Sequence, residues 1–468
     1  MHGNLDITLL EPHALRLGKL LAGGEGNEAA AYLQFGVSRV AADPWSGQPR
    51  SRLVSHRFCD IEGQERIGAS PVHVTWATAG FMRLLSEAKV KGYVPAIIHT
   101  HPGSHAFFSG QDDTNEAELA RTAFIKGVVG FVSIVLGGDG SVRARAWLPG
   151  GGIADAVHIQ QAGGRFRRWS YSTDAKAEAD HLQRQARLFG AGFNGLIRSL
   201  RVAVVGCGGT GSAVAMLLAR LGVGHLLLID NDTVETTNLN RVHGSRRSDA
   251  IAGRLKIDVL KREIAVAELG VEVTARKGWV NAAEMRDALK SCDFVFGCTD
   301  DHAGRVLLNR LAYFYGIAVI DVGLRMMPIE GRARHDINGR VTTLLPGRPC
   351  LLCSGVVNAR RAAEESLERS DPAEFRRRKQ EAYVVGAGDP APAVVTFTTE
   401  MACVAVDEMI GALTGFHGEE GMIPNRLRRF HARDDRFLAT RPNEACPVCM
   451  SADLWGRADI DPFLDMIG

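Results

Sequence analysis

The sequence predicts an α/β protein with two domains, in which a mixed α/β unit precedes a doubly wound, mostly parallel sheet. Three observations support this prediction. The chain has 468 residues, which is too long for one typical domain. Its N-terminal part alternates β-rich stretches with helical patterns. Further along, a glycine-rich loop follows a short apolar strand, and strands then alternate with helices.

The composition is that of an ordinary globular protein. Hydrophobic residues make up 46% of the chain, charged residues 23%, and the formal net charge is +2, so the charge balance indicates neither a nucleic-acid nor a membrane partner. No signal-peptide pattern opens the sequence, and no apolar run approaches the roughly 18 residues of a membrane helix. Four of the nine cysteines form two Cys-x-x-Cys pairs, which indicate metal binding rather than disulfides. We therefore expect a cytoplasmic protein.

Residues 1–150 are expected to form the first domain. The β-rich stretches are Tyr32–Val40, Arg52–Cys59, His73–Thr75, Val94–His99, Gly130–Leu136 and Val142–Leu148, and the clearest helical patterns are Thr78–Lys89 and Thr114–Ala123. The segment PGGGI ends this unit, because glycine and proline interrupt regular structure. Residues 151–177 are expected to be a linker, and residues 154–180 are a polar, weakly patterned connection that overlaps it.

Two histidines, His99 and His101, lie at the end of an apolar strand. Side chains alternate along a strand, so both imidazoles lie on one face and can reach one ion. Pro102 turns the chain, and Asp112 can then close back as a third ligand. Two nitrogens, a carboxylate oxygen and a water form a zinc site with an open position, where the pKa of the water falls to about 7. The pattern predicts a catalytic zinc.

The motif His-x-His-Pro-x6-Ser-x-x-Asp, residues 99–112, resembles that of the JAMM (MPN+/JAB) metalloproteases, and the resemblance covers roughly residues 5–148. It implies cleavage of peptide or isopeptide bonds after the C-terminal glycine of ubiquitin or ubiquitin-like proteins. It also implies that Ser109 binds the oxyanion of the tetrahedral intermediate. The alternative is a catalytically inactive domain of the same fold that only binds its target.

The same resemblance requires a glutamate that acts as general acid and base through the zinc-bound water. Glu28, in NEAAAYLQFG, matches it, although Ala31 stands where glycine is usual. Glu62 and Glu65 are weaker candidates, because they lie in a polar loop.

The second domain is expected over residues 178–450, with a tail over 451–468. Its strands are expected at Arg201–Val205, His225–Asp230, Val271–Lys277, Phe294–Cys298 and Ile317–Val322. Residues 355–392 are expected to be a crossover or insert region. Its charged part, 359–381, is predicted to be an exposed helical excursion or a mobile segment.

A glycine-rich loop, VVGCGGTGS, joins the first of these strands to a helix. Gly206, Gly208, Gly209 and Gly211 would let the backbone approach phosphates, and the helix N-terminus would offer N–H donors. Asp230 ends the next strand and is the expected ribose-binding acid. Such a loop alone suits NAD or FAD equally well.

The segment DNDTVETTNLNRVH, residues 230–243, resembles the signature of the ThiF/MoeB/ubiquitin-activating superfamily, and this resemblance covers about residues 178–440. These enzymes adenylate the C-terminal glycine of ubiquitin-like proteins, so the resemblance implies ATP and Mg²⁺ as cofactors. It implies the following roles: Asp230 binds the ribose, Asn238 and Arg241 the triphosphate and Lys256 the phosphates, and Asp300 orders the magnesium and the reacting carboxylate. A dehydrogenase would not need Arg241, Lys256 and Asp300 together.

The segment HLQRQARLFG, residues 181–190, partly matches the first helix of that superfamily. Arg184 matches an arginine that reaches the γ-phosphate across a dimer interface in relatives, so a homodimer is expected. His181 stands where a further arginine is usual. Cations at the α-phosphate would allow a carboxylate to attack and expel pyrophosphate without a general base.

The Cys-x-x-Cys pairs predict a structural, tetrahedral zinc bound by Cys350, Cys353, Cys446 and Cys449; the alternative is four free thiols. Relatives that pass the activated protein onward carry a nucleophilic cysteine in a crossover loop, here matched to residues 382–395, which hold none. Cys403, in an apolar helix, is expected to pack in the core and is the best remaining thioester candidate. Adenylation is therefore better supported than thioester transfer.

These resemblances together imply a two-domain enzyme of a bacterial ubiquitin-like conjugation pathway. The N-terminal domain would cleave at the Gly-Gly tail of a ubiquitin-like or sulfur-carrier β-grasp protein, and the C-terminal domain would adenylate the same tail. The expected cofactors are ATP, Mg²⁺ and two zinc ions, and an E2-like protein is expected as a further partner. Three alternatives stay open. These are sulfur-carrier activation for thiocarboxylate formation, a JAMM domain that only recruits the target, and activation of a small carboxylate or a peptide.

Overall fold

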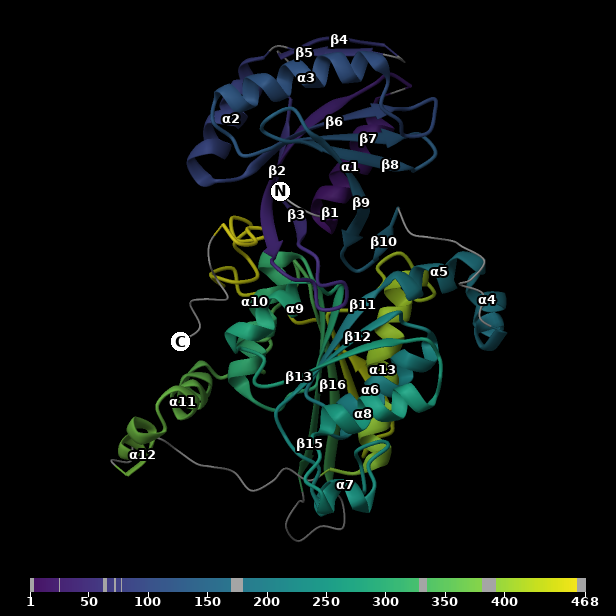
Figure 1. Ribbon diagram of the computed structural model, residues 1–468, viewed down its shortest axis with the longest axis vertical. Coiled ribbons are helices and arrows are strands. Elements are labelled where there is room, and N and C mark those ends of the chain that lie inside the picture. The colour runs from purple at the N-terminus through teal and green to yellow at the C-terminus, as the bar shows by residue number, and fades with distance from the viewer. Residues whose placement is uncertain are drawn as a thin grey trace. The chain divides into compact units, whose positions relative to one another are not determined.

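The computed structural model describes residues 4–24, 26–61, 65–70, 73–76, 78–169, 180–327, 335–380 and 393–460, and each of its two units is built on an eight-stranded sheet (Figure 1). The first unit comprises Met1–Tyr171, Phe314–Gly316 and Ser451–Phe463, and the second comprises the rest of the chain. Both units mix helices with strands, so the predicted fold class is confirmed. None of the described helices combines the length and the apolar character needed to cross a membrane.

The first sheet closes on itself. Its strands are β1 (Asn4–Leu10), β2 (Ala30–Val40), β3 (Arg50–Asp60), β6 (Val94–His101), β7 (Phe131–Gly137), β8 (Val142–Trp147), β9 (Ile153–Ala162) and β10 (Arg167–Arg168). The order is β1-β3-β2-β6-β7-β8-β9-β10, and β9 also pairs with β1. A separate hairpin joins β4 (Arg66–Ser70) to β5 (His73–Trp76), and the helices are α1 (Glu11–Gly23), α2 (Ala79–Lys91) and α3 (Gly110–Ile125).

The predicted polar connection over 154–180 is wrong for its first part. Residues 153–162 form β9, which pairs antiparallel with β8 and parallel with β1, and 167–168 form β10. The strand β9 looks weakly patterned because Asp155, His158, Gln160 and Gln161 interrupt its apolar residues, whereas main-chain pairing on both sides holds it in the sheet. Residues 170–179 lie outside the described part of the chain.

The helices of the first unit cover opposite faces of β6. Ala96 and Ile98 pack in the same cluster as Leu17 of α1, whereas Ile97 packs with Phe81 of α2 and Ala123 of α3. Alternation along the strand therefore directs every second side chain of β6, from Ile97 onward, toward α2 and α3. The two histidines at the end of β6 share this face.

The second sheet is doubly wound. Its strands are β11 (Arg201–Val205), β12 (His225–Asp230), β13 (Glu272–Lys277), β14 (Phe294–Gly297), β15 (Ala318–Met327), β16 (Asp336–Leu344), β17 (Asn425–Arg429) and β18 (Asp434–Phe437). The order is β13-β12-β11-β14-β15-β16-β17-β18, parallel through β15 and antiparallel beyond it. The strand order reverses between β11 and β14, which is where open α/β sheets bind their ligands.

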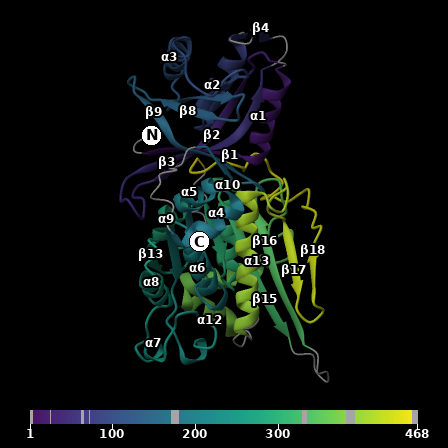
Figure 2. The same cartoon turned by 90° about the vertical axis from the view of Figure 1, so that its right-hand side faces the viewer.

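Helices α6 (Gly209–Leu221), α8 (Lys256–Val266) and α13 (Val395–Thr414) pack against this sheet. The other described α-helices after Asp180 are α4 (Gln183–Phe189), α5 (Ala191–Ser199), α7 (Arg247–Ile251), α9 (Arg286–Lys290), α10 (His302–Tyr315), α11 (Ala359–Ser370) and α12 (Pro372–Gln380). Figure 2 shows α13 beside β15 and β16. Helix α13 packs against these two strands and against α6.

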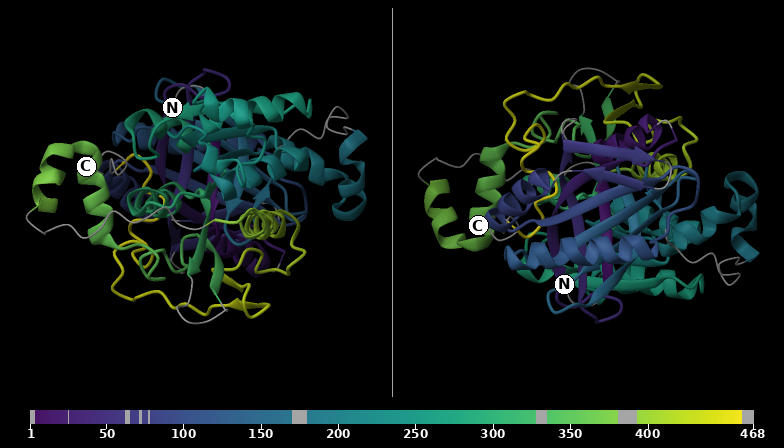
Figure 3. Two further views of the ribbon diagram at one scale, coloured as in Figure 1. Left: turned by 90° about the horizontal axis from the view of Figure 1, so that it is seen from below. Right: turned by 90° about the horizontal axis from the view of Figure 1, so that it is seen from above.

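The sequence did not predict β16, β17 and β18. The last two are rich in charged residues, NRLRR and DDRF, and ion pairs across the strands, such as Arg426 with Asp435 and Arg429 with Asp434, place these charges at a sheet edge. The charged insert contains α11 and α12, a helix pair that stands out in green in Figure 3. Most of the predicted crossover loop, 382–395, lies outside the described residues.

The predicted C-terminal tail is part of the first unit as far as it is described. Ala458 forms a bridge with Val37 of β2, and a carboxylate oxygen of Asp459 accepts a hydrogen bond from the main-chain N–H of Arg39 at 2.6 Å. The ring of His56 in β3 lies 2.7 Å from the carbonyl oxygen of Trp455. The tail therefore extends the packing of β2 and β3.

The closest packing in this contact involves Gly36. A Cβ atom there would lie 2.1 Å from the carbonyl oxygen of Gly456. We expect Gly36→Ala to lower the free energy of unfolding of the first unit by about 1–3 kcal/mol, as overpacking does. Urea unfolding of the full chain, with the first-unit transition assigned by hydrogen exchange in β2, measures the change.

Gly18→Ala is the matched control. Gly18 lies within α1, and a Cβ atom there would meet nothing within 4 Å, so alanine should raise stability by up to about 1 kcal/mol through helix propensity. A Gly36→Ala protein as stable as the wild type would contradict the packing.

Candidate metal centre and nucleotide-binding site

His99 and His101 lie side by side at the end of β6. Both side chains are buried, and their ring centroids are 5.0 Å apart. The ring of Phe107 lies 4.8 Å from that of His101, on the loop that follows. The strand thus delivers two imidazoles to one place, on the side that carries α2 and α3.

Asp112 reaches the histidines from the first turn of α3. Ser109 is the N-cap of this helix, and one carboxylate oxygen of Asp112 accepts hydrogen bonds from the N–H and the hydroxyl of Ser109, both at 2.7 Å. The other carboxylate oxygen lies 3.3 Å from Nε2 of His99. The capping hydrogen bonds with Ser109 therefore hold one carboxylate oxygen of Asp112 in place, and the other carboxylate oxygen faces the imidazoles.

The donor set fits a zinc ion. One ligand atom each from His99, His101 and Asp112 lies within 4.8 Å of the others. Among the described residues, Nδ1 of His101 is buried without a hydrogen-bond partner, and Nε2 of His99 is buried with the Asp112 carboxylate oxygen at 3.3 Å, an arrangement that a bound metal would complete. Zinc bound here would supply a water whose pKa is close to 7.

Glu28 faces His101 across the β2–β6 pair. Ala30 pairs with His99 in antiparallel register, so Glu28, two residues earlier, lies opposite His101. Its Oε1 is 3.6 Å from Nε2 of His101, and burial raises the pKa of the Glu28 carboxyl to about 7. Glu65 instead pairs with Arg83 on α2, and Glu62 lies outside the described residues.

A buried arginine that the sequence analysis missed supports α3. Arg145 of β8 pairs with Asp113 and Glu116, on the helix that carries Asp112, at 2.6 Å each, and its guanidinium lies 3.9 Å from the ring centroid of Phe108. These contacts fix α3 and the residue before its N-cap. An arginine at an inward-facing position of VRARAW was the available signal.

The glycine-rich loop of the second unit needs its glycines for two different reasons. Gly206 has φ +86°, a backbone conformation that favours glycine. A Cβ at Gly211 would lie 1.8 Å from the carbonyl oxygen of Gly206, so only glycine fits at residue 211. A Cβ at Gly208 would meet nothing within 4 Å, and one at Gly209 would meet the side chain of Arg241 at 3.3 Å. Space therefore remains beside Gly208, at the N-cap of α6, where no side chain caps the helix.

Asp230 braces this loop. Its carboxylate accepts hydrogen bonds from the N–H of Cys207 at 2.6 Å and from that of Asp232 at 2.7 Å, while burial raises its pKa. Each oxygen keeps a further lone pair that a ribose hydroxyl could use. The positive charge of Lys256, at the start of α8, lowers the pKa of Asp230 and so partly offsets the effect of burial. Nζ of Lys256 also forms an ion pair with Asp232 at 2.8 Å.

The other predicted nucleotide ligands lie around the same strand ends. The side-chain oxygen of Asn238 accepts a hydrogen bond from the N–H of Glu235, so this side chain already has a structural role. Arg241 donates to the carbonyl oxygen of Thr237 at 2.6 Å and borders Gly209. Asp300 is exposed and follows β14.

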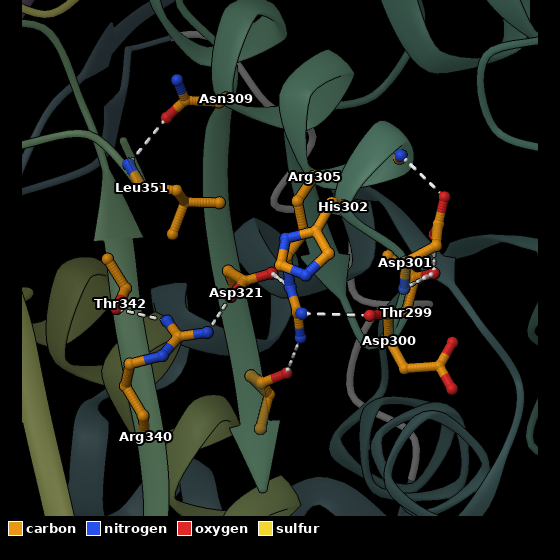
Figure 4. Close-up of polar contacts among 12 residues, drawn as sticks. Thr299, Asp300, Asp301, His302, Arg305, Asn309, Asp321, Arg340, Thr342 and Leu351 are labelled. Atoms are coloured by element: carbon orange, nitrogen blue, oxygen red, sulfur yellow. Dashed lines mark hydrogen bonds and ion pairs between the residues drawn. The ribbon is translucent and has the colours of Figure 1, made fainter. Parts of the chain in front are cut away.

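A buried network lies behind Asp300. Asp321 of β15 has 0% exposure and pairs with both Arg305 and Arg340, and Arg305 donates to the main-chain carbonyl of Asp300 at 3.3 Å. Figure 4 shows the Asp300 carboxylate pointing away from these contacts. The network fixes the backbone and leaves this side chain free to bind a ligand.

Two predicted residues lie elsewhere on the second unit. Arg184 is exposed on α4, a helix with no buried residue. Cys403 is exposed on α13, so its predicted core packing is wrong: α13 is apolar because it is covered on several sides, and Cys403 lies on its open side. Partial burial together with Asp407 and Glu400 raises the pKa of this thiol, which disfavours a thiolate nucleophile.

The four cysteines of the two Cys-x-x-Cys pairs form one cluster. Sγ of Cys350 lies 3.7 Å from that of Cys446, and Sγ of Cys353 lies 3.5 Å from that of Cys449. A tetrahedral zinc with bonds of about 2.3 Å separates its sulfurs by about 3.8 Å, so the cluster has the size that zinc requires. Asn309 of α10 accepts the N–H of Leu351 at 2.9 Å and fixes the first Cys-x-x-Cys turn.

Comparison with known proteins agrees with both sequence resemblances. The ThiF family matches residues 182–449, and prokaryotic homologs of the JAB domain match residues 11–148. The SAMP-activating enzyme E1 of Haloferax volcanii is 28% identical over 272 residues, which cover 57% of this chain and 86% of that enzyme.

A second relative matches a shorter region. The molybdopterin-synthase adenylyltransferase of Escherichia coli is 31% identical over 174 residues, which cover 36% of this chain and 65% of that enzyme. Among solved structures, that of E. coli MccB has a TM-score of 0.45 and 18% identity, and the match covers 59% of this chain and 74% of that one. A likeness at this level carries no argument about function.

We expect the full chain to bind two equivalents of zinc. Asp112→Asn should retain one equivalent and Cys446→Ser the other, because the two ligand sets are separate. The second variant should also destabilise the second unit, since structural zinc contributes folding energy. Metal analysis of purified proteins measures both, with Cys403→Ser as the control that keeps two equivalents. Equal zinc content in all four proteins would contradict the assignment.

The raised pKa of Glu28 has a consequence for the metal-free protein. Between its ordinary pKa of 4.5 and about 7, the folded state keeps a proton that the unfolded chain releases. The contribution of Glu28 to stability should therefore fall as the pH rises through this window. Glu28→Gln cannot ionise, so it should gain stability over the wild type across the same window. Urea unfolding of chelator-treated proteins tests this, and a difference independent of pH would contradict it.

Proposed function

The chain belongs to the ThiF family and carries an N-terminal Prok-JAB domain, and on that basis we propose that it adenylates the C-terminal carboxylate of a ubiquitin-like or sulfur-carrier protein with ATP. The two relatives named above support this choice, because one activates SAMP proteins and the other is a molybdopterin-synthase adenylyltransferase.

One observation carries the proposal. The loop after β11, Asp230 at the end of β12 and Asp300 after β14 all lie at the carboxyl ends of neighbouring parallel strands, around the point where the strand order reverses. The open space at Gly208 and the uncapped N-terminus of α6 suit a phosphate group.

The chemistry follows from the charges at this edge. A carboxylate and a triphosphate repel each other, and Arg241, Lys256 and the N–H groups of α6 reduce that repulsion. A carboxylate oxygen then attacks the α-phosphorus, the bond to the bridging oxygen breaks, and pyrophosphate leaves. Asp300 would hold Mg²⁺, which further neutralises phosphate charge. Before ATP binds, Lys256 must exchange its ion pair with Asp232 for the phosphates.

We further propose that the Prok-JAB domain hydrolyses a bond at the same C-terminal tail. Glu28 is placed to take a proton from water and return it to the leaving amine, and burial keeps the pKa of its carboxyl near neutrality. The hydroxyl of Ser109 donates to Asp112 at 2.7 Å, so it must turn to reach an oxyanion. Processing before activation, or reversal of conjugation afterwards, would both use this reaction.

Sulfur-carrier activation is the second candidate. The segment matched to the crossover loop contains no cysteine, and Cys403, the exposed alternative, has a raised pKa. Both features favour an adenylate that is released to an external sulfur donor. Formation of a thiocarboxylate on the carrier protein, detected by mass spectrometry, distinguishes this outcome from a conjugate.

ATP–pyrophosphate exchange tests the adenylation. The wild type should exchange pyrophosphate only with a β-grasp protein that ends in Gly-Gly, and Arg241→Ala or Lys256→Ala should lower the rate by about 100- to 1,000-fold. Lys261→Ala, an exposed lysine on the same helix as Lys256, should keep the wild-type rate. Exchange that does not need the Gly-Gly protein would point to a small carboxylate or a peptide instead.

Cleavage of a Gly-Gly fusion protein tests the other domain. Glu28→Gln should abolish cleavage but leave pyrophosphate exchange intact, because Glu28 belongs to the first unit and the nucleotide loop to the second. A wild type that binds the fusion without cleaving it would favour a recruiting role for the Prok-JAB domain.

A further inference from the structure

Helix α11 of the charged insert lies against the loop that carries Asp300. Glu365 accepts a hydrogen bond from the main-chain N–H of Ala303 at 2.8 Å. Arg369, one turn further along, pairs with Asp301 at 2.8 Å. The N–H of Asn358, at the N-cap of α11, donates to the ring of His302 at 3.2 Å. Three consecutive residues, the last of the loop and the first two of α10, are thus held by α11 and its N-cap.

The ion pair between Arg369 and Asp301 is largely shielded from solvent. The side chain of Arg369 is 17% exposed and that of Asp301 is 11% exposed. The guanidinium of Arg369 also stacks over Trp279 at 3.7 Å from the ring centroid. Such a pair differs from the surface pairs of α12, because removing one partner leaves a shielded charge without its ion-pair partner.

The Asp301 carboxylate also accepts hydrogen bonds from residues on both sides of it in the chain, Thr299 and Gly304. One carboxylate oxygen accepts the N–H of Gly304 at 2.8 Å at the start of α10, and the other accepts the hydroxyl of Thr299. Asp300 lies between these anchored residues, and Arg305 holds its carbonyl from behind (Figure 4). The exposed Asp300 carboxylate is therefore presented by a backbone that is fixed from two directions.

We propose that α11 is a clamp on the Asp300 loop and that Arg369 is a positioning residue for adenylation. This inference rests on the proposed function of Asp300 as the group that holds the divalent cation. Arg369 does not touch the nucleotide; it acts through Asp301, which fixes the backbone of its neighbour. Loss of the clamp should therefore raise the Mg²⁺ requirement of the reaction more than the KM for ATP at saturating Mg²⁺.

The closing experiment uses the full chain, four variants of the ion pair and one control variant. Arg369→Ala and Asp301→Asn each remove one charge of the pair, the double variant removes both, and Arg369→Lys keeps the charge without the planar group. Arg360→Ala is the matched control, because Arg360 lies on α11 with a side chain that is 67% exposed. Thermal unfolding of every variant checks that the second unit stays folded.

Two readouts are measured. Hydrogen exchange of the peptide over residues 299–304 should quicken about tenfold in Arg369→Ala, since the pair lies between the surface and fully buried cases. The Mg²⁺ concentration for half-maximal pyrophosphate exchange should rise by a similar factor, with partial recovery in Arg369→Lys. The double variant should be no worse than the single ones, because both remove the same interaction.

The outcomes separate the two proposals. Unchanged hydrogen exchange in Arg369→Ala overturns the clamp, whatever the activity. Faster hydrogen exchange with an unchanged Mg²⁺ requirement overturns the positioning role. A wild type without pyrophosphate exchange overturns the proposed adenylation, while the hydrogen-exchange comparison still decides whether α11 restrains the loop.

Discussion

Main-chain pairing between neighbouring strands is the constraint on which both candidate sites depend. The antiparallel register of β2 with β6 places Glu28 opposite His101, and alternation along β6 turns both histidines to the same side. The parallel register of β11 with β12 and β14 brings the glycine-rich loop, Asp230 and Asp300 to one sheet edge. A shift of one residue in β6 would turn both imidazoles away from Asp112, so the hydrophobic pattern of the strand determines whether the predicted metal ligands can converge.

Motifs tied to strand ends could be predicted from the sequence, and contacts between distant segments could not. The histidines, Asp112 and the four cysteines form the two clusters that their spacing suggested. The segment after Ile153 was missed because a strand paired on both sides tolerates polar side chains. Cys403 was assigned to the core because an apolar helix does not reveal which of its sides stays open. Spacing alone also gave no sign of the contact between Arg369 and Asp301, which lie 68 residues apart.

Shielded arginine–carboxylate contacts recur beside the functional groups. Arg145 supports α3, Arg305 and Arg340 surround Asp321, and Arg369 holds Asp301. A shielded ion pair adds little net stability, because desolvation of both charges offsets most of their attraction. Its directional hydrogen bonds do fix geometry, and a site that binds a metal or a phosphate needs its ligands held in place before the ligand arrives. These ion pairs thus contribute more to holding the candidate ligand-binding groups in position than to the free energy of unfolding.

The packing of residues 451–460 against β2 and β3 has a consequence for how the protein is made. A ribosome releases β2 early, whereas Asp459 follows Arg39, its hydrogen-bond partner, by 420 positions. This part of β2 and β3 therefore lacks its C-terminal packing partner throughout translation of the ThiF domain. Any truncated or prematurely terminated product would carry an incomplete N-terminal domain, so that domain can reach its full packing only after the ThiF domain has been synthesised.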